Sequence, residues 1–258
     1  MTAGTSFNGR SALVTGAASG IGAAVACALN DAGIERLVLV DQDADGLDAL
    51  PLRCTVQRWI GDVTDEALWN RIDQSIGTID HAVLNAGVAD AAPITSLGFD
   101  EWRRILSVNL DGMFLSLRSA LRAMTLDGEA RGRSAVLTSS VAGLKPIAGT
   151  AAYGASKAAV AHLARIAAAE HAGDGIRINA VAPGRVDTPI WTRNAHFAQM
   201  VEDLGSRQAA LDVLAAETTP LGRPATAAEM AAQIVFLLSD AAWNVTGTVL
   251  VSDGGYSL

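Results

Sequence analysis

Short apolar runs alternate with segments of helical spacing along the whole 258-residue chain, and this alternation constrains the fold most strongly. The apolar runs are continuous, which is typical of strands buried on both faces of a parallel sheet. Alternation with helices therefore predicts an α/β fold: one doubly wound domain over residues 1–258, with a seven-stranded, mostly parallel sheet covered by helices on both faces. The predicted strands are Ser11–Thr15, Leu37–Val40, Thr55–Ile60, His81–Leu84, Ala135–Thr138, Ile176–Val181 and Thr248–Val251.

Residues 187–223 interrupt this alternation with a long stretch of mixed polarity. Within it, Trp191, Phe197, Met200 and Leu204 are spaced to line one side of a short helix. Open parallel sheets bind ligands at the carboxyl ends of their strands, so we predict that this segment is a helical lid over a substrate site. The alternative is an ordinary helical hairpin on the surface.

Charge and composition disfavour several classes of partner. The net charge is −8 and the 19 basic residues form no run, which argues against a nucleic-acid groove. The first residues do not resemble a secretion signal, and no charge-free apolar stretch reaches the ~18 residues of a spanning helix, so we expect a cytoplasmic protein without membrane contact. The histidines lack metal-ligand spacing, and the calcium-like pattern at residues 41–46 has Leu52 where a Glu is required. We expect no bound metal.

A glycine-rich turn follows the first predicted strand and opens the first predicted helix. Glycine lets the backbone turn sharply and approach a pyrophosphate, and the positive end of the helix dipole favours an anion there. The strand–turn–helix context therefore predicts a Rossmann-type dinucleotide site, although the glycine spacing, G-x-x-x-G-x-G, is weak evidence alone. The candidate residues of this turn are Gly16, Ser19, Gly20, Ile21 and Gly22.

Asp41 stands directly after the second predicted strand. A carboxylate at this position accepts hydrogen bonds from ribose hydroxyls and repels a 2′-phosphate. Ala17, Ala18 and Gln42 supply no basic group for such a phosphate. We therefore predict NAD, not NADP, as the cofactor.

Tyr153 and Lys157 lie about one turn apart in a predicted helix, so the phenol and the ammonium share one face. A neighbouring positive charge favours the phenolate and brings the tyrosine pKa, ordinarily near ~10, toward the range of a useful general acid–base. Ser140 follows the preceding strand, where its hydroxyl can donate to a carbonyl oxygen that gains charge. Ser139 is the alternative, because side chains alternate along a strand. The Y-x-x-x-K pattern alone also fits a solvated helix face.

Together these motifs resemble the short-chain dehydrogenase/reductase family in its compact form, and the resemblance covers essentially the whole chain. Each motif is weak alone, whereas all of them at family-like spacing are specific. They occur in the family's order: Thr15–Gly22, Asp62–Val63, Asn85–Gly87, Asn109, Ser140, Tyr153 with Lys157, Pro183–Gly184 with Thr188, and Asp253–Gly255.

The resemblance implies a role for each matching residue. It implies Tyr153 as the acid–base, Ser140 as the holder of the substrate oxygen, and Lys157 as the group that lowers the tyrosine pKa and binds the nicotinamide ribose. Asn109 is implied to position a water that links Lys157 to a proton relay. The implied cofactor contacts are Asp62 and Val63 at the adenine, Asn85 and Gly87 at the adenosine-side ribose, and Val186 and Thr188 at the nicotinamide carboxamide, with Ala86, Pro183 and Gly184 completing the set.

The sequence therefore predicts an oxidoreductase that transfers a hydride between NAD(H) and a secondary alcohol or ketone. Arg193 and His196 could meet a polar substrate group, or belong to a solvated lid surface. An apolar pocket for a hydrophobic or cyclic alcohol is suggested by Leu144, Ile147, Trp191, Phe197 and Met200.

Two other functions compete with this one. A 3-oxoacyl thioester reductase usually uses NADPH and needs a basic patch for an acidic carrier, and neither is evident. A catalytically silent NAD-binding regulator would be expected to lose Tyr153, Lys157 or Ser140, and all three are present.

The Ala-rich helix Ala152–Ala169 has small residues almost all round, which suits burial against both the sheet and a second subunit. Related proteins commonly pair this helix and the Asn109 helix across a two-fold axis. We expect a homotetramer, with a dimer as the fallback.

Overall fold

The computed structural model describes residues 6–128, 130, 132–193 and 195–258. Seven strands form one parallel sheet in the order β3-β2-β1-β4-β5-β6-β9. Each predicted strand is confirmed, with ends shifted by no more than two residues. Their bounds are β1 Ser11–Thr15, β2 Arg36–Asp41, β3 Thr55–Ile60, β4 His81–Leu84, β5 Ser134–Thr138, β6 Arg177–Pro183 and β9 Val249–Ser252.

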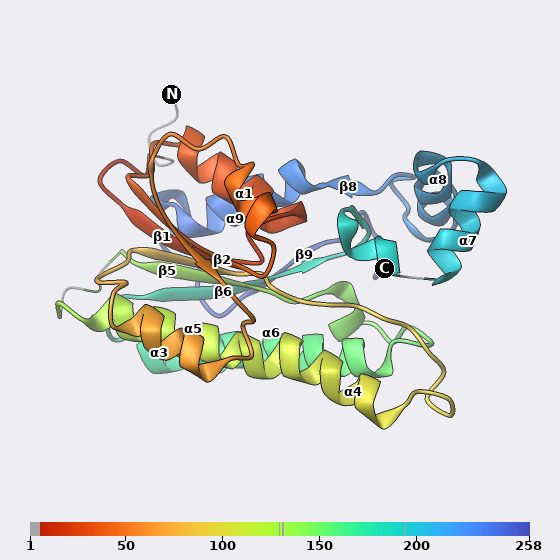
Figure 1. The fold of residues 1–258 in the computed structure, drawn as a ribbon, viewed down its shortest axis with the longest axis horizontal. Helices are drawn as coiled ribbons and strands as arrows, with labels where there is room; N and C mark the ends of the chain where they lie inside the picture. Colours follow the sequence, from red (N-terminus) through yellow and green to blue (C-terminus); the bar gives the residue numbers. More distant parts are fainter. Residues whose placement is uncertain (1–5, 129, 131, 194) are drawn as a thin grey trace.

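Helices cover both faces of the sheet (Figure 1). Side chains alternate along a strand, so neighbouring residues of β1 enter different cores. Leu13 packs in the core beneath α3, α5 and α6, whereas Ala12 and Val14 pack in the core beneath α1 and α9. The inner strands read as apolar runs because both of their faces are buried, whereas the edge strands β3 and β9 are partly exposed. The helix bounds are α1 Gly20–Asp31, α2 Ala44–Asp48, α3 Glu66–Asp73, α4 Phe99–Leu106, α5 Gly112–Thr125, α6 Ala151–His171 and α9 Ala227–Leu238, with the short 3₁₀ turn η4 at Asp240–Ala242.

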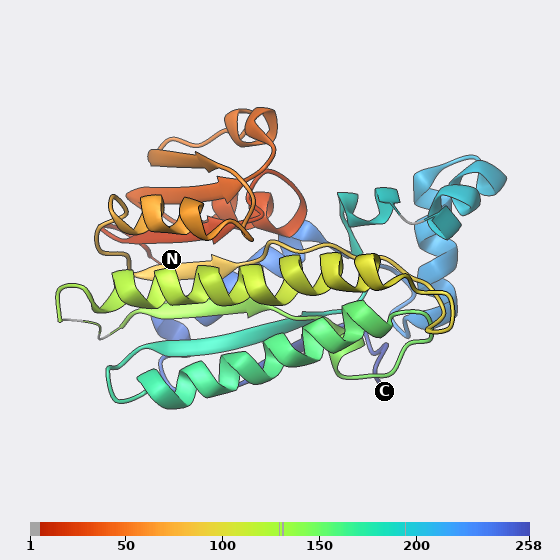
Figure 2. The ribbon, with the colours of Figure 1, turned by 60° about the horizontal axis from the view of Figure 1, so that its bottom comes forward.

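A π-helical turn, η1 (Ser107–Asp111), joins α4 to α5. The apolar spacing of Trp102, Ile105, Leu110 and Leu117 predicts one long helix here, and the structure divides it at this turn. A π turn adds a residue to the helical path and changes which side chains face the core. The combined α4–η1–α5 rod lies beside α6 on one face of the sheet (Figure 2), and η1 directs Asn109 toward α6, where it is fully buried.

The predicted lid segment contains the 3₁₀ turn η3 (Pro189–Arg193) and two helices, α7 (Ala195–Leu204) and α8 (Arg207–Thr218). They lie beyond the carboxyl end of the sheet (Figure 1). The segment starts at β7 (Val186–Asp187) and ends at β8 (Ala225–Thr226), which pair in parallel.

The predicted lid segment, called the lid below for brevity, has a small core of its own, in which Phe197 and Leu211 are buried and Trp191 and Met200 are partly buried. Leu204 does not belong to this core: it ends α7, is 43% exposed, and the prediction that it lines the same side is wrong. In the described part of the chain, no helix combines the length and apolarity needed to cross a bilayer.

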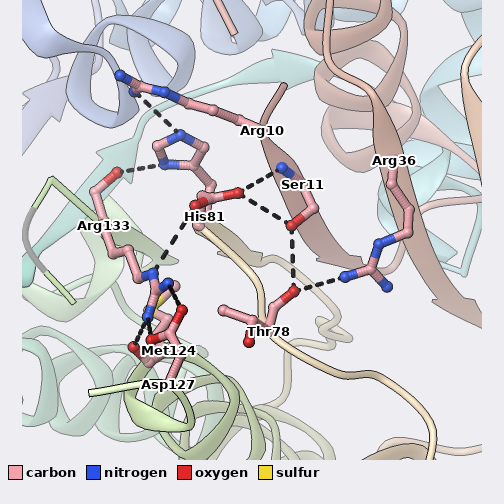
Figure 3. A network of polar contacts seen from close by, with 10 residues as sticks. Arg10, Ser11, Arg36, Thr78, His81, Met124, Asp127 and Arg133 are labelled. Atoms are coloured by element: carbon pink, nitrogen blue, oxygen red, sulfur yellow. Dashed lines mark hydrogen bonds and ion pairs between the residues drawn. The ribbon is translucent and has the colours of Figure 1, made fainter. Parts of the chain in front are cut away.

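The opposite, amino edge of the sheet carries a polar network (Figure 3). The Ser134 hydroxyl donates to the Leu238 carbonyl oxygen at 2.9 Å, so it accepts from His81 Nδ1, also at 2.9 Å, while His81 Nε2 faces Arg10. Burial lowers the pKa of His81 to about 3, and Arg10 and Arg177 add to this shift. Polar residues begin six strands at this edge: Ser11, Arg36, Thr55, His81, Ser134 and Arg177.

Candidate active site

A cleft of about 700 Å³ runs along the carboxyl ends of the strands and reaches the lid. It lies where the strand order reverses, because β1 has β2 on one side and β4 on the other. Parallel sheets bind ligands at such a reversal, where diverging loops leave a crevice. The cleft brings together most of the predicted site residues: Gly16, Ser19, Gly20, Ile21, Asp41, Val63, Asn85, Ala86, Gly87, Ser140, Tyr153, Lys157, Pro183, Gly184, Val186 and Thr188.

The glycine turn is shaped by close backbone packing. Gly16 has φ +65°, and a Cβ there would lie 2.9 Å from the backbone of Ala86. A Cβ on Gly22 would lie 2.0 Å from the Gly16 carbonyl oxygen. Gly22 does not line the cleft, so its contribution is to let α1 start against the turn. Ser19 caps α1 without a side-chain hydrogen bond, which leaves the first helical N–H groups beside the cleft to bind an anion.

Two acidic residues predicted at the adenosine end have different positions. Asp41 lines the cleft, and its carboxylate accepts hydrogen bonds from the backbone N–H groups of Ala18 at 2.9 Å and Asp43 at 3.1 Å. These bonds fix the carboxylate and leave lone pairs for a ribose. Asp62 does not line the cleft, and it accepts from the Thr64 N–H at 2.9 Å.

Thr15 positions the loop after β4. Its hydroxyl oxygen accepts from the backbone N–H groups of Asn85 at 3.0 Å and Ala86 at 3.2 Å. The Asn85 side chain donates to the Gly16 carbonyl oxygen at 3.4 Å and accepts from the Thr138 hydroxyl at 3.3 Å. The loop therefore links the glycine turn to the end of β5. This narrow, glycine-lined cradle fits a dinucleotide, because added Cβ atoms would fill it.

Ser140, Tyr153 and Lys157 meet in the deeper part of the cleft. Ser140 lies just beyond β5 at the start of the 3₁₀ turn η2 (Val141–Gly143), and the other two lie in the first turns of α6. The Lys157 ammonium donates to the Thr138 carbonyl oxygen at 2.8 Å and lies 5.8 Å from the centroid of the Tyr153 ring. Three groups suited to proton transfer and oxyanion binding thus share one site.

Burial dominates the ionisation of both catalytic candidates on α6. It lowers the pKa of Lys157 to about 8, because no solvent stabilises the ammonium. Burial also raises the pKa of Tyr153, while a hydrogen bond with Ser140 acts in the opposite direction. The lowering of the Tyr153 pKa by Lys157 stays a prediction for the protein with bound dinucleotide.

The structure distinguishes the two serines that the sequence left open. The Ser139 hydroxyl donates to the backbone carbonyl oxygen of Lys157 at 2.7 Å, so it fixes α6 against β5. Ser140 Oγ accepts from the Ala142 N–H at 3.2 Å and interacts with Tyr153. Ser140 is therefore the better-placed oxyanion donor.

Asn109 lies behind the cleft and does not line it. Its Oδ1 accepts from the Val88 N–H at 2.8 Å, and its Nδ2 donates to the Val88 carbonyl oxygen at 2.9 Å and to Ser156 Oγ at 3.1 Å. A Cβ on Gly87 would lie 3.2 Å from Asn109 Oδ1 and 3.3 Å from Lys157 Nζ, so a larger residue would have to displace these two side chains slightly. The side chain positions the loop after β4; the water-positioning role stays a prediction.

The lid end of the cleft differs in part from the predicted apolar pocket. Ile147, Trp191 and Phe197 line the cleft, whereas Leu144 and Met200 do not. Leu144 is 42% exposed, and Met200 packs inside the lid. The side chains of Arg193 and His196 lie outside the described part of the chain.

Sequence reasoning missed three residues of this region. Ser156 joins Asn109 to α6, and its only sequence signal is its place between Tyr153 and Lys157. Arg185 and Tyr256 both line the cleft. Tyr256 follows the Asp253–Gly255 motif, and that adjacency is the only hint that the sequence offers.

Comparison with known proteins agrees with this geometry. The family described as Enoyl-(Acyl carrier protein) reductase matches residues 16–257. The chain is 41% identical to cis-4-hydroxycyclohexanecarboxylate dehydrogenase of Sinomonas cyclohexanicum, over 98% of this chain and 99% of that protein. It is 38% identical to D-threitol dehydrogenase of Mycolicibacterium smegmatis, over 98% of this chain and 94% of that protein.

The fold also matches solved structures. The structure of levodione reductase superimposes with a TM-score of 0.84 at 35% identity, covering 97% of this chain and 98% of that one. The predicted α/β fold, the predicted family and the prediction of an oxidoreductase acting on alcohol and ketone groups are confirmed. Full-length similarity, together with the cleft and its Ser–Tyr–Lys arrangement, shows that the chain belongs to the short-chain dehydrogenase/reductase family of NAD(P)-dependent oxidoreductases.

Proposed function

We propose that the protein is an NAD-dependent dehydrogenase of a hydrophobic or cyclic secondary alcohol, and that it also reduces the corresponding ketone. The observation that carries this proposal is one cleft that contains the glycine turn, Asp41 and the Ser140–Tyr153–Lys157 group. When bound, the nicotinamide supplies the carbon that accepts or returns the hydride. The protein's own residues supply binding, orientation and proton transfer.

Tyr153 is the proposed acid–base. During oxidation its phenolate oxygen takes the hydroxyl proton of the alcohol as the hydride leaves the carbinol carbon, and during reduction the phenol returns a proton to the ketone oxygen. Ser140 donates a hydrogen bond to that oxygen and opposes the burial that raises the Tyr153 pKa. The Lys157 ammonium favours the phenolate and binds the ribose.

Asp41 supports NAD over NADP. Its carboxylate is fixed at the adenosine end by two backbone N–H groups, and the neighbouring Gln42, which also lines the cleft, carries no charge. The Asp41 carboxylate would repel a 2′-phosphate placed there. The nearby Ala17 and Ala18 carry no positive charge that could compensate this repulsion.

The substrate class follows from the lid end of the cleft. Ile147, Trp191 and Phe197 give it an apolar wall, and an apolar wall suits a hydrocarbon ring. The similar dehydrogenase from Sinomonas is named for a hydroxycyclohexanecarboxylate, which contains such a ring. We include in this proposal that residues 187–223 act as the substrate lid of a single domain.

The test is a screen of cyclic and acyclic secondary alcohols, read as NADH formation by absorbance, with NADP in parallel. Turnover with NAD, lost in Tyr153→Phe while NAD affinity is kept, supports the proposal. Turnover only with 3-oxoacyl thioesters and NADPH would favour the thioester reductase. NAD binding without turnover of any substrate would favour the silent regulator.

We also propose a homotetramer, with a dimer as the alternative. A shallow apolar groove lies between α5 and α6, and it includes Phe114, 48% exposed, and Ile166, 43% exposed. Apolar side chains of this size on two adjacent helices are suited to burial by a second subunit. Light scattering that shows a monomer at micromolar concentration would contradict this. A cytoplasmic location stays a prediction.

A further inference from the structure

The carboxyl-terminal tail reaches the substrate end of the cleft, where Tyr256 forms part of the lining. The tail is firmly anchored. The Asp253 carboxylate accepts from the backbone N–H groups of Gly255 at 2.9 Å and Ser257 at 2.7 Å, and the Gly254 carbonyl oxygen accepts from the Leu221 N–H at 3.0 Å. The backbone around Tyr256 is therefore fixed to the end of the lid.

Two cations hold the Tyr256 ring. The Lys145 ammonium lies 4.9 Å from the ring centroid and donates to the Tyr256 carbonyl oxygen at 2.6 Å. The Arg185 guanidinium carbon lies 5.5 Å from the same centroid. Cations are attracted to the faces of aromatic rings, so these contacts limit the motion of the side chain.

The same contacts connect Tyr256 to both sides of the site. Lys145 follows η2 and is one of only two lysines in the chain, the other being Lys157. Arg185 also lies 5.5 Å from the Trp191 ring and donates to the Thr218 hydroxyl at 2.7 Å, so it ties the tail to two parts of the lid. Tyr256 thus lies between the segment that follows η2 and the lid.

We infer that Tyr256 is a specificity-determining residue, and that its ring is one wall of the pocket for the ring of a cyclic alcohol. The inference rests on the proposed function and adds a residue outside the lid to the substrate site. An aromatic side chain that is already held in place loses little entropy on binding, and the part of the ring that lines the cleft offers an apolar surface to a saturated ring. A short acyclic alcohol covers less of that surface and depends on it less.

The experiment compares kcat/KM for cyclohexanol and 2-butanol in the full-length protein, and measures NAD affinity by fluorescence titration. Tyr256→Ala is expected to reduce kcat/KM for cyclohexanol about tenfold or more, with a much smaller change for 2-butanol and unchanged NAD affinity. Tyr256→Phe keeps the ring and is expected to behave like the wild type. Phe236→Ala is the matched control, at a 44%-exposed aromatic residue of α9. It should leave kcat/KM for both alcohols and the NAD affinity unchanged.

Lys145→Met provides a second variant, because it keeps the alkyl stem and removes the ammonium. It is expected to shift the cyclohexanol to 2-butanol ratio in the same direction by a smaller factor. Equal losses for both alcohols in both variants, or a loss of NAD affinity, would overturn the inference. If the wild type forms no NADH from any alcohol, the proposed function fails and the inference fails with it.

Discussion

The hydroxyl of Ser156 donates a 2.7 Å hydrogen bond to the backbone carbonyl oxygen of Tyr153. The same hydroxyl oxygen accepts from Asn109 Nδ2, so one fully buried serine joins the π-helical turn to the first turn of α6. Asn109 also binds the backbone N–H and the carbonyl oxygen of Val88. The hydrogen bond between Asn109 and Ser156 therefore positions the loop after β4 relative to α6.

Ser156→Ala is therefore expected to lower kcat about tenfold while NAD affinity changes little. The substitution leaves Asn109 Nδ2 without a buried hydrogen-bond partner and removes the contact that positions the first turn of α6. The pH dependence of kcat should shift too, since the phenol and the ammonium move relative to each other. Ser116→Ala is the control: Ser116 is equally buried, but donates to the Gly112 carbonyl oxygen within α5. Similar losses in both variants would indicate general destabilisation.

The rate of alcohol oxidation is expected to rise between pH 6 and about pH 8. Burial raises the pKa of Tyr153, so the phenolate needed as a base becomes more populated as the pH increases. Above about pH 8, the pKa of Lys157, loss of the ammonium proton should offset the growing phenolate fraction, so the profile should level off. Initial rates from pH 6 to 10 test this. The rate of Lys157→Arg should be lower but should continue to rise above pH 8, because a guanidinium stays protonated. A flat wild-type profile would contradict the assignment.

Asp41→Ala is expected to reduce the preference for NAD over NADP by about tenfold or more, since it removes both the ribose acceptor and the repulsion of a 2′-phosphate. The ratio of kcat/KM values for the two cofactors is the measurement. Asp43→Ala is a nearby control, because Asp43 caps α2 by accepting from the Gly46 N–H and does not line the cleft. A wild-type preference for NADP would show that the assignment of Asp41 is wrong.

Acid should destabilise the protein through His81. Its pKa is about 3 in the folded state against an ordinary 6.5, so the stability it contributes is complete above 6.5 and is lost as the pH falls toward 3. Between pH 7.5 and 4.5 this amounts to about 3 kcal/mol. Urea unfolding at both pH values tests it. His81→Gln, which cannot titrate, should show a smaller difference between the two values than the wild type. An equal difference would assign the acid sensitivity to carboxylates alone.

The fold was predictable because the inner strands of the sheet are buried on both faces and therefore read as continuous apolar runs, although the edge strands β3 and β9 are partly exposed. The cradle was predictable for a similar reason, since Gly16 must occupy a positive φ beside Ala86. The π-helical turn was not, because one added residue leaves the apolar spacing on either side almost unchanged. The position of Tyr256 in the cleft was not predictable, because it depends on contacts with Lys145 and Arg185, which are distant in the sequence.

The short ladder that pairs Val186 with Ala225 and Asp187 with Thr226 brings the two ends of a long insertion side by side. An insertion whose two ends lie side by side can change in length and composition without moving the strands on either side of it. The strand order of the large sheet and the polar network at the amino ends of its strands would then stay as they are. Transplanting residues 187–223 between relatives is therefore expected to change the choice of alcohol in part, because Ile147 and Tyr256 lie outside the segment, and to leave the proton chemistry in place. Variation in substrate choice can therefore be concentrated in residues 187–223, while the sheet and the Ser140–Tyr153–Lys157 group stay constant.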